Sequence, residues 1–157
     1  MIHPFIADQM RTLQRVHPGA TILALPSGAC VVEVPRVRLL SGWSARIVSK
    51  PATRYTVEVS APAPNPKQCT MLLCLPPGYP GAQPRHFWTR EAIRSEDGHR
   101  RPGNSSEQCP MPGYDGIVGT WFAYSLQTWN PNNDGILQFF HTMRLRLQCA
   151  FEGREAA

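Results

Sequence analysis

The sequence predicts an α+β domain in which an N-terminal helix, four or five antiparallel strands and a long irregular loop precede a C-terminal helix. Apolar residues recur with helical spacing near both ends of the chain, whereas short β-branched and aliphatic runs fill its middle. Prolines and glycines gather around residues 61–66, 76–84 and 102–116, where they indicate ordered turns and one long loop. Strands followed by a helix are typical of helices packed on one face of a meander.

The first helix is predicted over residues 4–16. Its apolar side chains share one helical face: Phe5, Ile6, Met10, Leu13 and Val16. His17, Pro18 and Gly19 end the helix, because a residue before proline avoids the α region and glycine does not hold it. Arg11 and Arg15 share a face away from most of the apolar residues.

Short strands are predicted between this helix and a proline-rich turn. They cover residues 21–25, 29–34, 37–40, 54–60 and 68–75, and residues 43–48, which alternate imperfectly, are a further candidate. The first three are separated by Pro26-Ser27-Gly28 and by Pro35-Arg36, which favours a hairpin or meander. Residues 54–60 alternate clearly, and residues 68–75 are apolar almost throughout, as expected of a central strand.

The proline-rich turn follows the central strand at residues 76–80. Proline fixes φ and lacks a backbone donor, so the chain must leave the sheet at Pro76 and can rejoin it only after Pro84. Residues 85–89 are then predicted as the last strand of the sheet. Tyr79 is expected to pack its ring into the turn and to hydrogen-bond through its hydroxyl rather than to take part in chemistry.

Residues 90–119 show no periodicity and are rich in glycine, proline, serine and asparagine. Loops of this length in compact domains are usually functional or partly disordered. A short helical turn is predicted over residues 121–126. The last helix is predicted from about residue 135 to residue 149 or 151, with Asn132 or Asn133 as its N-cap.

Charge and composition narrow the classes of function. The net charge of +5 is modest, and much of it lies between residues 85 and 101. This basic stretch suits a solvated face, an acidic protein partner or nucleic acid, and no known nucleic-acid motif accompanies it. No apolar stretch reaches the roughly 20 residues that span a bilayer, and residues 1–8 do not resemble a signal peptide. A cytoplasmic protein of one domain, residues 1–157, is therefore expected.

Five cysteines stand at positions 30, 69, 74, 109 and 149. None forms a C-x-x-C pair, so the sequence supports no zinc site, and no metal or cofactor is expected. Cys30, Cys74 and Cys149 lie among apolar residues and are interpreted as small buried hydrophobes, whereas Cys69 is ambiguous. Cys109 differs, because it stands in a polar stretch rich in proline and glycine.

Two local motifs resemble those of the ubiquitin-conjugating-enzyme (UBC) fold. The first is a strand followed by Pro-x-x-Tyr-Pro, a further proline and an aromatic strand, and it matches residues 75–80, Pro84 and Phe87-Trp88. The second is Trp-x-Pro before a helix, and it matches Trp129-Asn130-Pro131 followed by Ile136-Leu137. With an unusual loop between the motifs, the chain resembles divergent bacterial members of this superfamily.

The resemblance implies that a cysteine between the two motifs carries the carboxyl terminus of a ubiquitin-like protein as a thioester. In the family this cysteine usually lies nearer the Trp-x-Pro tryptophan, at a spacing that here falls on Trp121. The cysteine between the motifs is Cys109, twenty residues before Trp129. Asn104 is the nearest match to an asparagine that supports the oxyanion in the family, and Asp115 is a candidate to orient or deprotonate the incoming amine.

Thioester formation at Cys109 needs an accessible cysteine with thiolate character. Four basic residues lie close to it in sequence: Arg94, His99, Arg100 and Arg101. Positive charge favours a thiolate, so this proximity predicts a lowered pKa for the Cys109 thiol.

Two classes of function follow from these observations. In the first, the chain is an enzyme that takes a ubiquitin-like protein from an activating enzyme and passes it to an amine of a target protein. The resemblance implies a bacterial conjugation system, with antiphage defence as one setting. It also implies that the first helix, with Arg11 and Arg15, meets the activating enzyme, and a solvated face is the alternative for these arginines. In the second class, the chain is an inactive UBC-like module that binds a ubiquitin-like protein or another conjugation component.

Overall fold

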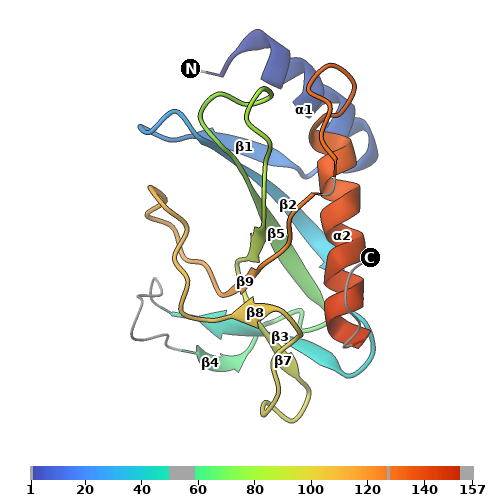
Figure 1. Ribbon diagram of the computed structural model, residues 1–157. Coiled ribbons are helices and arrows are strands. Elements are labelled where there is room, and N and C mark those ends of the chain that lie inside the picture. Colours follow the sequence, from blue (N-terminus) through green and yellow to red (C-terminus); the bar gives the residue numbers. More distant parts are fainter. Residues whose placement is uncertain (1, 50–58, 127, 153–157) are drawn as a thin grey trace.

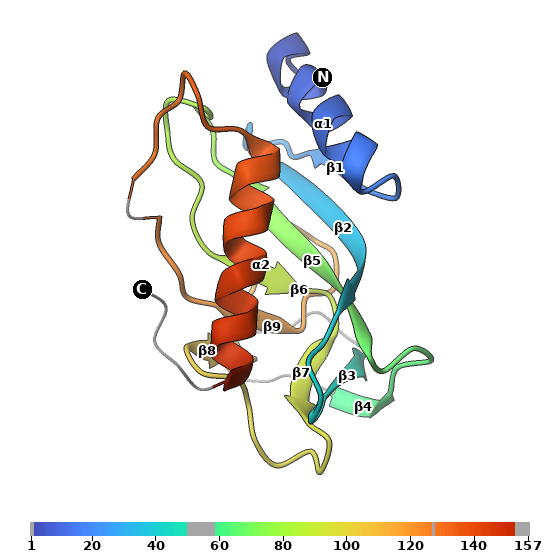
Figure 2. The ribbon, with the colours of Figure 1, turned by 90° about the vertical axis from the view of Figure 1, so that its right-hand side faces the viewer.

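The computed structural model describes residues 2–49, 59–126 and 128–152. Within them, two helices accompany a six-stranded and a three-stranded antiparallel sheet (Figure 1). Helix α1 spans Pro4–Val16 and helix α2 spans Ile136–Glu152. Figure 2 shows α2 lying along one face of the larger sheet, with α1 near one end of that face. The α+β class is confirmed.

Helix α1 has the bounds that its periodicity predicts. The His3 side chain accepts a hydrogen bond from the Phe5 backbone N–H at 3.1 Å and so caps the first turn. Met10 and Leu13 are buried, and they anchor the apolar stripe on the core. The His17 backbone N–H closes the last turn on the Leu13 carbonyl at 2.8 Å.

The larger sheet is built around its two longest strands. In spatial order it contains β1 (Thr21–Ala24), β2 (Cys30–Arg38), β5 (Gln68–Leu75), β6 (Phe87–Thr89), β9 (Thr120–Phe122) and β8 (Ser105–Ser106). Strand β2 runs through Pro35-Arg36, where a break between two strands was predicted. The register shifts between Val34 and Val37, where two residues of β2 face one residue of β5, so the strand bulges there and continues beyond the bulge.

A second sheet of order β4-β3-β7 corrects the prediction of a single meander. It contains β3 (Trp43–Val48), β4 (Val59–Pro62) and β7 (Ala92–Ser95). The predicted strand at residues 54–60 lies mostly outside the described residues, and β4 continues to Pro62, beyond the predicted break. Strand β3 pairs with β7, which lies far along the chain, and a meander pairs only sequential neighbours.

The segment after β6 is more regular than its sequence predicts. Strands β7 and β8 lie inside the interval 90–119, and β9 replaces the helical turn predicted over residues 121–126. Strand β9 pairs with β6, so residues 85–89 do not hold the last strand of the sheet. The Ile93 backbone N–H also bonds to Thr120 Oγ1 at 2.9 Å, and this links the two sheets. Strands of two to four residues are too short to show a period, which explains why the pattern missed them.

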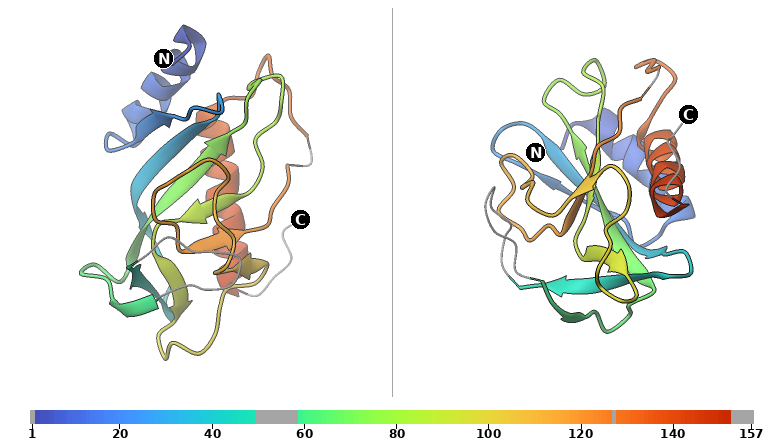
Figure 3. Two further views of the ribbon diagram at one scale, coloured as in Figure 1. Left: turned by 90° about the vertical axis from the view of Figure 1, so that its left-hand side faces the viewer. Right: turned by 60° about the horizontal axis from the view of Figure 1, so that its bottom comes forward.

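Alternation along the strands gives the larger sheet two apolar faces. One face packs under α2, where Leu73, Phe87 and Phe122 meet Phe140 and Met143 in the main core. The other face carries a second cluster: Val31, Leu72, Trp88, Met111 and Val118. The segment between β8 and β9 covers this second face, on the side of the sheet away from α2 (Figure 3).

Helix α2 begins at Ile136 and is not capped by Asn132 or Asn133 as predicted. The Gly135 N–H bonds instead to Gln138 Oε1 at 3.0 Å, and the Ile136 N–H bonds to Gln9 Oε1 at 3.1 Å. A side chain from α1 therefore satisfies one of the orphan amides of α2, which ties the two helices together.

Candidate active site

Cys109 lies in the segment between β8 and β9, against the second face of the larger sheet. Trp88 donates its indole Nε1–H to the Cys109 carbonyl oxygen at 2.8 Å. Because Trp88 is only 5% exposed, this bond is largely shielded from water and holds the backbone of Cys109 on the sheet. The cysteine itself is half-buried, so it keeps part of the access that an acyl acceptor requires.

Polar contacts of Tyr114, Arg90 and Glu33 hold the same segment after Cys109 in the sequence. Tyr114 packs against the second cluster, and its hydroxyl lies 3.2 Å from Arg90 Nη2, which donates to it. Arg90 also forms an ion pair with Glu33 of β2. The segment is therefore anchored to two strands of the sheet, by Trp88 of β6 and through Glu33 of β2.

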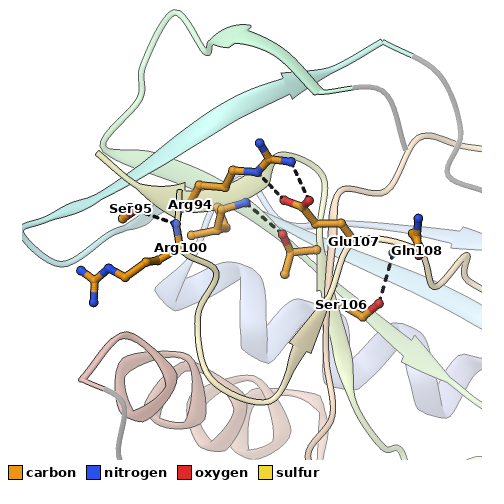
Figure 4. Close-up of polar contacts among 8 residues, drawn as sticks. Arg94, Ser95, Arg100, Ser106, Glu107 and Gln108 are labelled. Atoms are coloured by element: carbon orange, nitrogen blue, oxygen red, sulfur yellow. Dashed lines mark hydrogen bonds and ion pairs between the residues drawn. The ribbon is translucent and has the colours of Figure 1, made fainter. Parts of the chain in front are cut away.

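An ion pair between Arg94 and Glu107 holds the part of the segment that precedes Cys109 in the sequence. The Arg94 guanidinium donates Nε–H and Nη2–H to the two carboxylate oxygens of Glu107, at 2.8 Å and 2.7 Å (Figure 4). The Glu107 side chain is 5% exposed and that of Arg94 is 27% exposed. Bidentate arginine–carboxylate pairs are among the stronger ion pairs. The carboxylate of Glu107 therefore offsets the positive charge of Arg94.

The Cys109 thiol does not have the lowered pKa that the nearby basic residues predicted. Burial raises the pKa of Cys109. Arg94 faces Glu107, and the Arg100 guanidinium lies over the Trp43 ring at 5.6 Å. Closeness in sequence therefore does not translate into a cation beside the sulfur, and the prediction of a lowered pKa was wrong.

The structure does not bring Asn104 to Cys109. Asn104 adopts a left-handed backbone conformation with φ of 53°, and its carbonyl accepts the Ala123 N–H at 2.9 Å. Its side chain lies near the hydroxyl of Tyr124, whose pKa burial raises, but no hydrogen bond joins the two groups. Tyr124 belongs to the main core under α2, whereas Cys109 is held on the opposite face of the sheet.

The three remaining site candidates are all exposed. Asp115 follows Tyr114 in the segment that carries Cys109. Arg11 forms an ion pair with Asp8 one helical turn earlier, and Arg15 lies in the last turn of α1. Both arginines are open to a partner, and the Arg11–Asp8 pair also suits an ordinary solvated face.

The other cysteines divide by burial. Cys30 and Cys69 are buried, whereas Cys74 and Cys149 are half-buried. Burial raises the pKa of Cys30, Cys69 and Cys74. The predicted burial is confirmed for Cys30, whereas Cys74 and Cys149 are buried only in part, and the ambiguous Cys69 proves to be a core residue. No three His, Cys, Asp or Glu side chains of the described residues gather in a way that could hold a metal ion.

The two motifs that carried the resemblance meet in space. The Trp129 indole N–H donates to the Pro80 carbonyl at 2.7 Å, and the Tyr79 and Trp129 ring centroids are 5.7 Å apart. The Tyr79 hydroxyl donates to Gln9 Oε1 at 2.5 Å. The expected structural role of Tyr79 is confirmed. The role of Gln9 was missed, because a polar residue in the first helix carries no signal for a contact with α2.

Comparison with known proteins identifies the family. No curated protein and no solved structure matches the chain at a significant level. Neither described helix is both long enough and apolar enough to cross a membrane. The family model described as "Prokaryotic E2 family E" matches residues 52–150, more than half of the chain and all of the loop with Cys109. The chain therefore belongs to this prokaryotic family of proteins related to ubiquitin-conjugating enzymes.

Proposed function

We propose that this protein accepts the carboxyl terminus of a ubiquitin-like protein on Cys109 as a thioester and transfers it to an amine of a target. The observation that carries the proposal is the Trp88–Cys109 bond, which places a partly accessible cysteine in a fixed position on the sheet. Family membership supports conjugation-related chemistry, and the matched region spans both motifs and this cysteine. An activating enzyme, a ubiquitin-like protein and a target are the partners that this chemistry requires.

The first step is a thioester exchange. The Cys109 thiolate attacks the carbonyl carbon of the thioester on the activating enzyme, a new S–C bond forms, and the thiol of the activating enzyme leaves. Because burial raises the pKa of Cys109, only a small fraction is thiolate near neutral pH, and the step accelerates as pH rises.

The second step is attack of a target amine on the Cys109 thioester. The amine nitrogen bonds to the carbonyl carbon, loses a proton, and the Cys109 sulfur leaves. Asp115 is exposed on the same segment, and we assign it to orient that amine. Support of the oxyanion by Asn104 would require its amide to turn away from Tyr124.

The proposal is tested with the purified chain, ATP, the cognate activating enzyme and its ubiquitin-like protein. A covalent adduct that disappears on addition of a thiol reductant is expected for the wild type and absent for Cys109→Ala. The half-buried cysteines provide matched controls, so Cys74→Ala and Cys149→Ala should form the adduct like the wild type. Loss of the adduct in a control variant, with Cys109→Ala active, would reassign the acceptor.

A second candidate function is a binding module without thioester chemistry. The raised pKa of Cys109 and its spacing of twenty residues from Trp129 favour this alternative. Such a module would bind the ubiquitin-like protein in calorimetry with equal affinity for the wild type and Cys109→Ala. It would form no adduct in the presence of the activating enzyme and ATP, which separates it from the enzyme.

A further inference from the structure

A cavity of about 340 Å³ opens between helix α2 and the second half of β2. Cationic and apolar side chains share its lining, which includes His17, Arg36, Arg38, Phe140, Arg144 and Leu147. None of the residues assigned to conjugation lines it. Pockets for small ligands occupy roughly 300–1,000 Å³, so this cavity is large enough for a compact molecule.

The bulge in β2 brings Arg36 to this cavity. Arg36 has a φ of 58°, a left-handed conformation that a long non-glycine side chain rarely adopts. Its guanidinium lies against Gly19, with Nη2 only 2.7 Å from where a β-carbon on Gly19 would stand. A strained backbone that the surrounding fold maintains is a feature of binding sites, and here it positions a cation.

The three arginines of the cavity differ from those near Cys109. Arg90 and Arg94 are paired with Glu33 and Glu107, respectively. Among the residues that the structure describes, no carboxylate pairs with Arg36, Arg38 or Arg144. Three arginines therefore contribute positive charge to one cavity, and the Arg144 guanidinium lies over the Phe140 ring at 5.9 Å. Guanidinium groups in such a concave site suit an anion.

His17 lines the same cavity and lies close enough to Arg144 for the charge of the arginine to affect its pKa. Burial, Arg144 and His141 together lower the pKa of His17, which keeps the ring neutral near neutral pH. Its Nε2 atom is shielded from solvent and has no hydrogen-bond partner in the described part of the chain. A buried nitrogen without a partner is costly, so it favours a ligand that supplies one.

We propose that this cavity binds a small phosphate-bearing molecule of about the size of a nucleoside monophosphate. Guanidinium groups match the geometry of phosphate oxygens and bind them in bidentate fashion. The buried side chains of Phe140 and Leu147 provide an apolar wall for the uncharged part of the ligand. The concave shape and modest volume favour a compact ligand over an extended acidic peptide.

The test is calorimetric titration of the full chain with AMP, adenosine and inorganic phosphate at constant ionic strength near neutral pH. Binding of AMP, with adenosine weaker by about tenfold or more, is expected from guanidinium–phosphate contacts. Inorganic phosphate separates the two sources of the anion: affinity equal to that of AMP identifies the free ion, and weaker affinity identifies a phosphorylated organic molecule. Failure of both AMP and phosphate to bind at millimolar concentration would overturn the proposal.

Matched variants locate the site. Arg36→Asn suits the left-handed backbone, and Arg144→Gln keeps a polar side chain on α2, so both should fold. Each is expected to weaken AMP binding by about tenfold. Arg85→Gln removes the same charge from an exposed position outside the cavity and should bind like the wild type. Equal weakening by Arg85→Gln would show a nonspecific charge effect and refute the site, and thermal unfolding of each variant verifies folding.

Discussion

The indole N–H of Trp88 and the carbonyl oxygen of Cys109 form a 2.8 Å hydrogen bond that fixes the candidate nucleophile on the sheet face opposite α2. Trp88→Phe keeps an aromatic ring on the second cluster but removes this donor. We expect the free energy of unfolding to fall by about 1–3 kcal/mol, since a shielded carbonyl loses its partner. Alkylation of Cys109 by iodoacetamide should become faster, because the segment is less restrained.

Urea denaturation and mass-spectrometric alkylation measure these two effects. Trp121→Phe is the matched control, since Trp121 packs on the same cluster without bonding to Cys109. If both variants sped up alkylation equally, the Trp88–Cys109 bond would not be what restrains the segment.

The pH dependence of Cys109 reactivity follows from its burial. Burial raises the pKa of Cys109, so its thiolate fraction at neutral pH is smaller than that of a free cysteine, whose pKa is about 8.5. The alkylation rate should therefore rise with pH and reach its midpoint above that value. A midpoint below it would mean that a cation reaches the sulfur in solution, and would support the original prediction from the sequence.

The Arg94–Glu107 ion pair is expected to stabilise the segment before Cys109. Arg94→Met leaves the nearly buried Glu107 carboxylate without its partner, and we expect a loss of about 2–4 kcal/mol in the free energy of unfolding. Arg11→Met breaks the exposed pair with Asp8 and should cost at most about 0.5 kcal/mol. Chemical denaturation of both variants provides the comparison, and equal losses would argue against a structural role for the buried pair.

Tyr79 should act as scaffold. Tyr79→Phe removes one hydroxyl, while Gln9 Oε1 keeps its bond from the Ile136 N–H. The expected cost is about 0.5–1.5 kcal/mol, and thioester formation should keep its wild-type rate. Tyr79→Ala also empties the space beside Trp129 and should cost about 3–5 kcal/mol. A large drop in the rate of thioester formation for the folded Tyr79→Phe variant would instead give its hydroxyl a chemical role.

Periodicity explains which elements the sequence predicts. Helix α1 and strands β3 and β5 have their predicted bounds. The thirteen residues of α1 show the helical period, the eight of β5 form an apolar run, and the six of β3 alternate imperfectly. Strands β7, β8 and β9 were missed, since each is two to four residues long and depends on pairing with distant segments. Local sequence cannot encode such pairing.

The candidate site shows the same division. Cys109 stands out in the sequence because its surroundings are polar, and the structure places it in a defined position. The residues expected beside Cys109 because they are close to it in sequence make their contacts elsewhere. Arg94 is paired with Glu107, and Asn104 lies near Tyr124 on the other side of the sheet. Which side chain a charge or an amide meets depends on tertiary contacts.

The central claim is that Cys109 carries the ubiquitin-like protein, and the most direct measurement is the intact mass of the Cys109→Ser adduct. The reaction contains the activating enzyme, ATP and the ubiquitin-like protein, with and without a thiol reductant, which cleaves a thioester by exchange. The wild type should form an adduct that reductant removes, whereas any adduct of Cys109→Ser should be an oxygen ester that survives reductant and is cleaved by alkali. A reductant-sensitive adduct on Cys109→Ser, equal in yield to that of the wild type, would contradict the account.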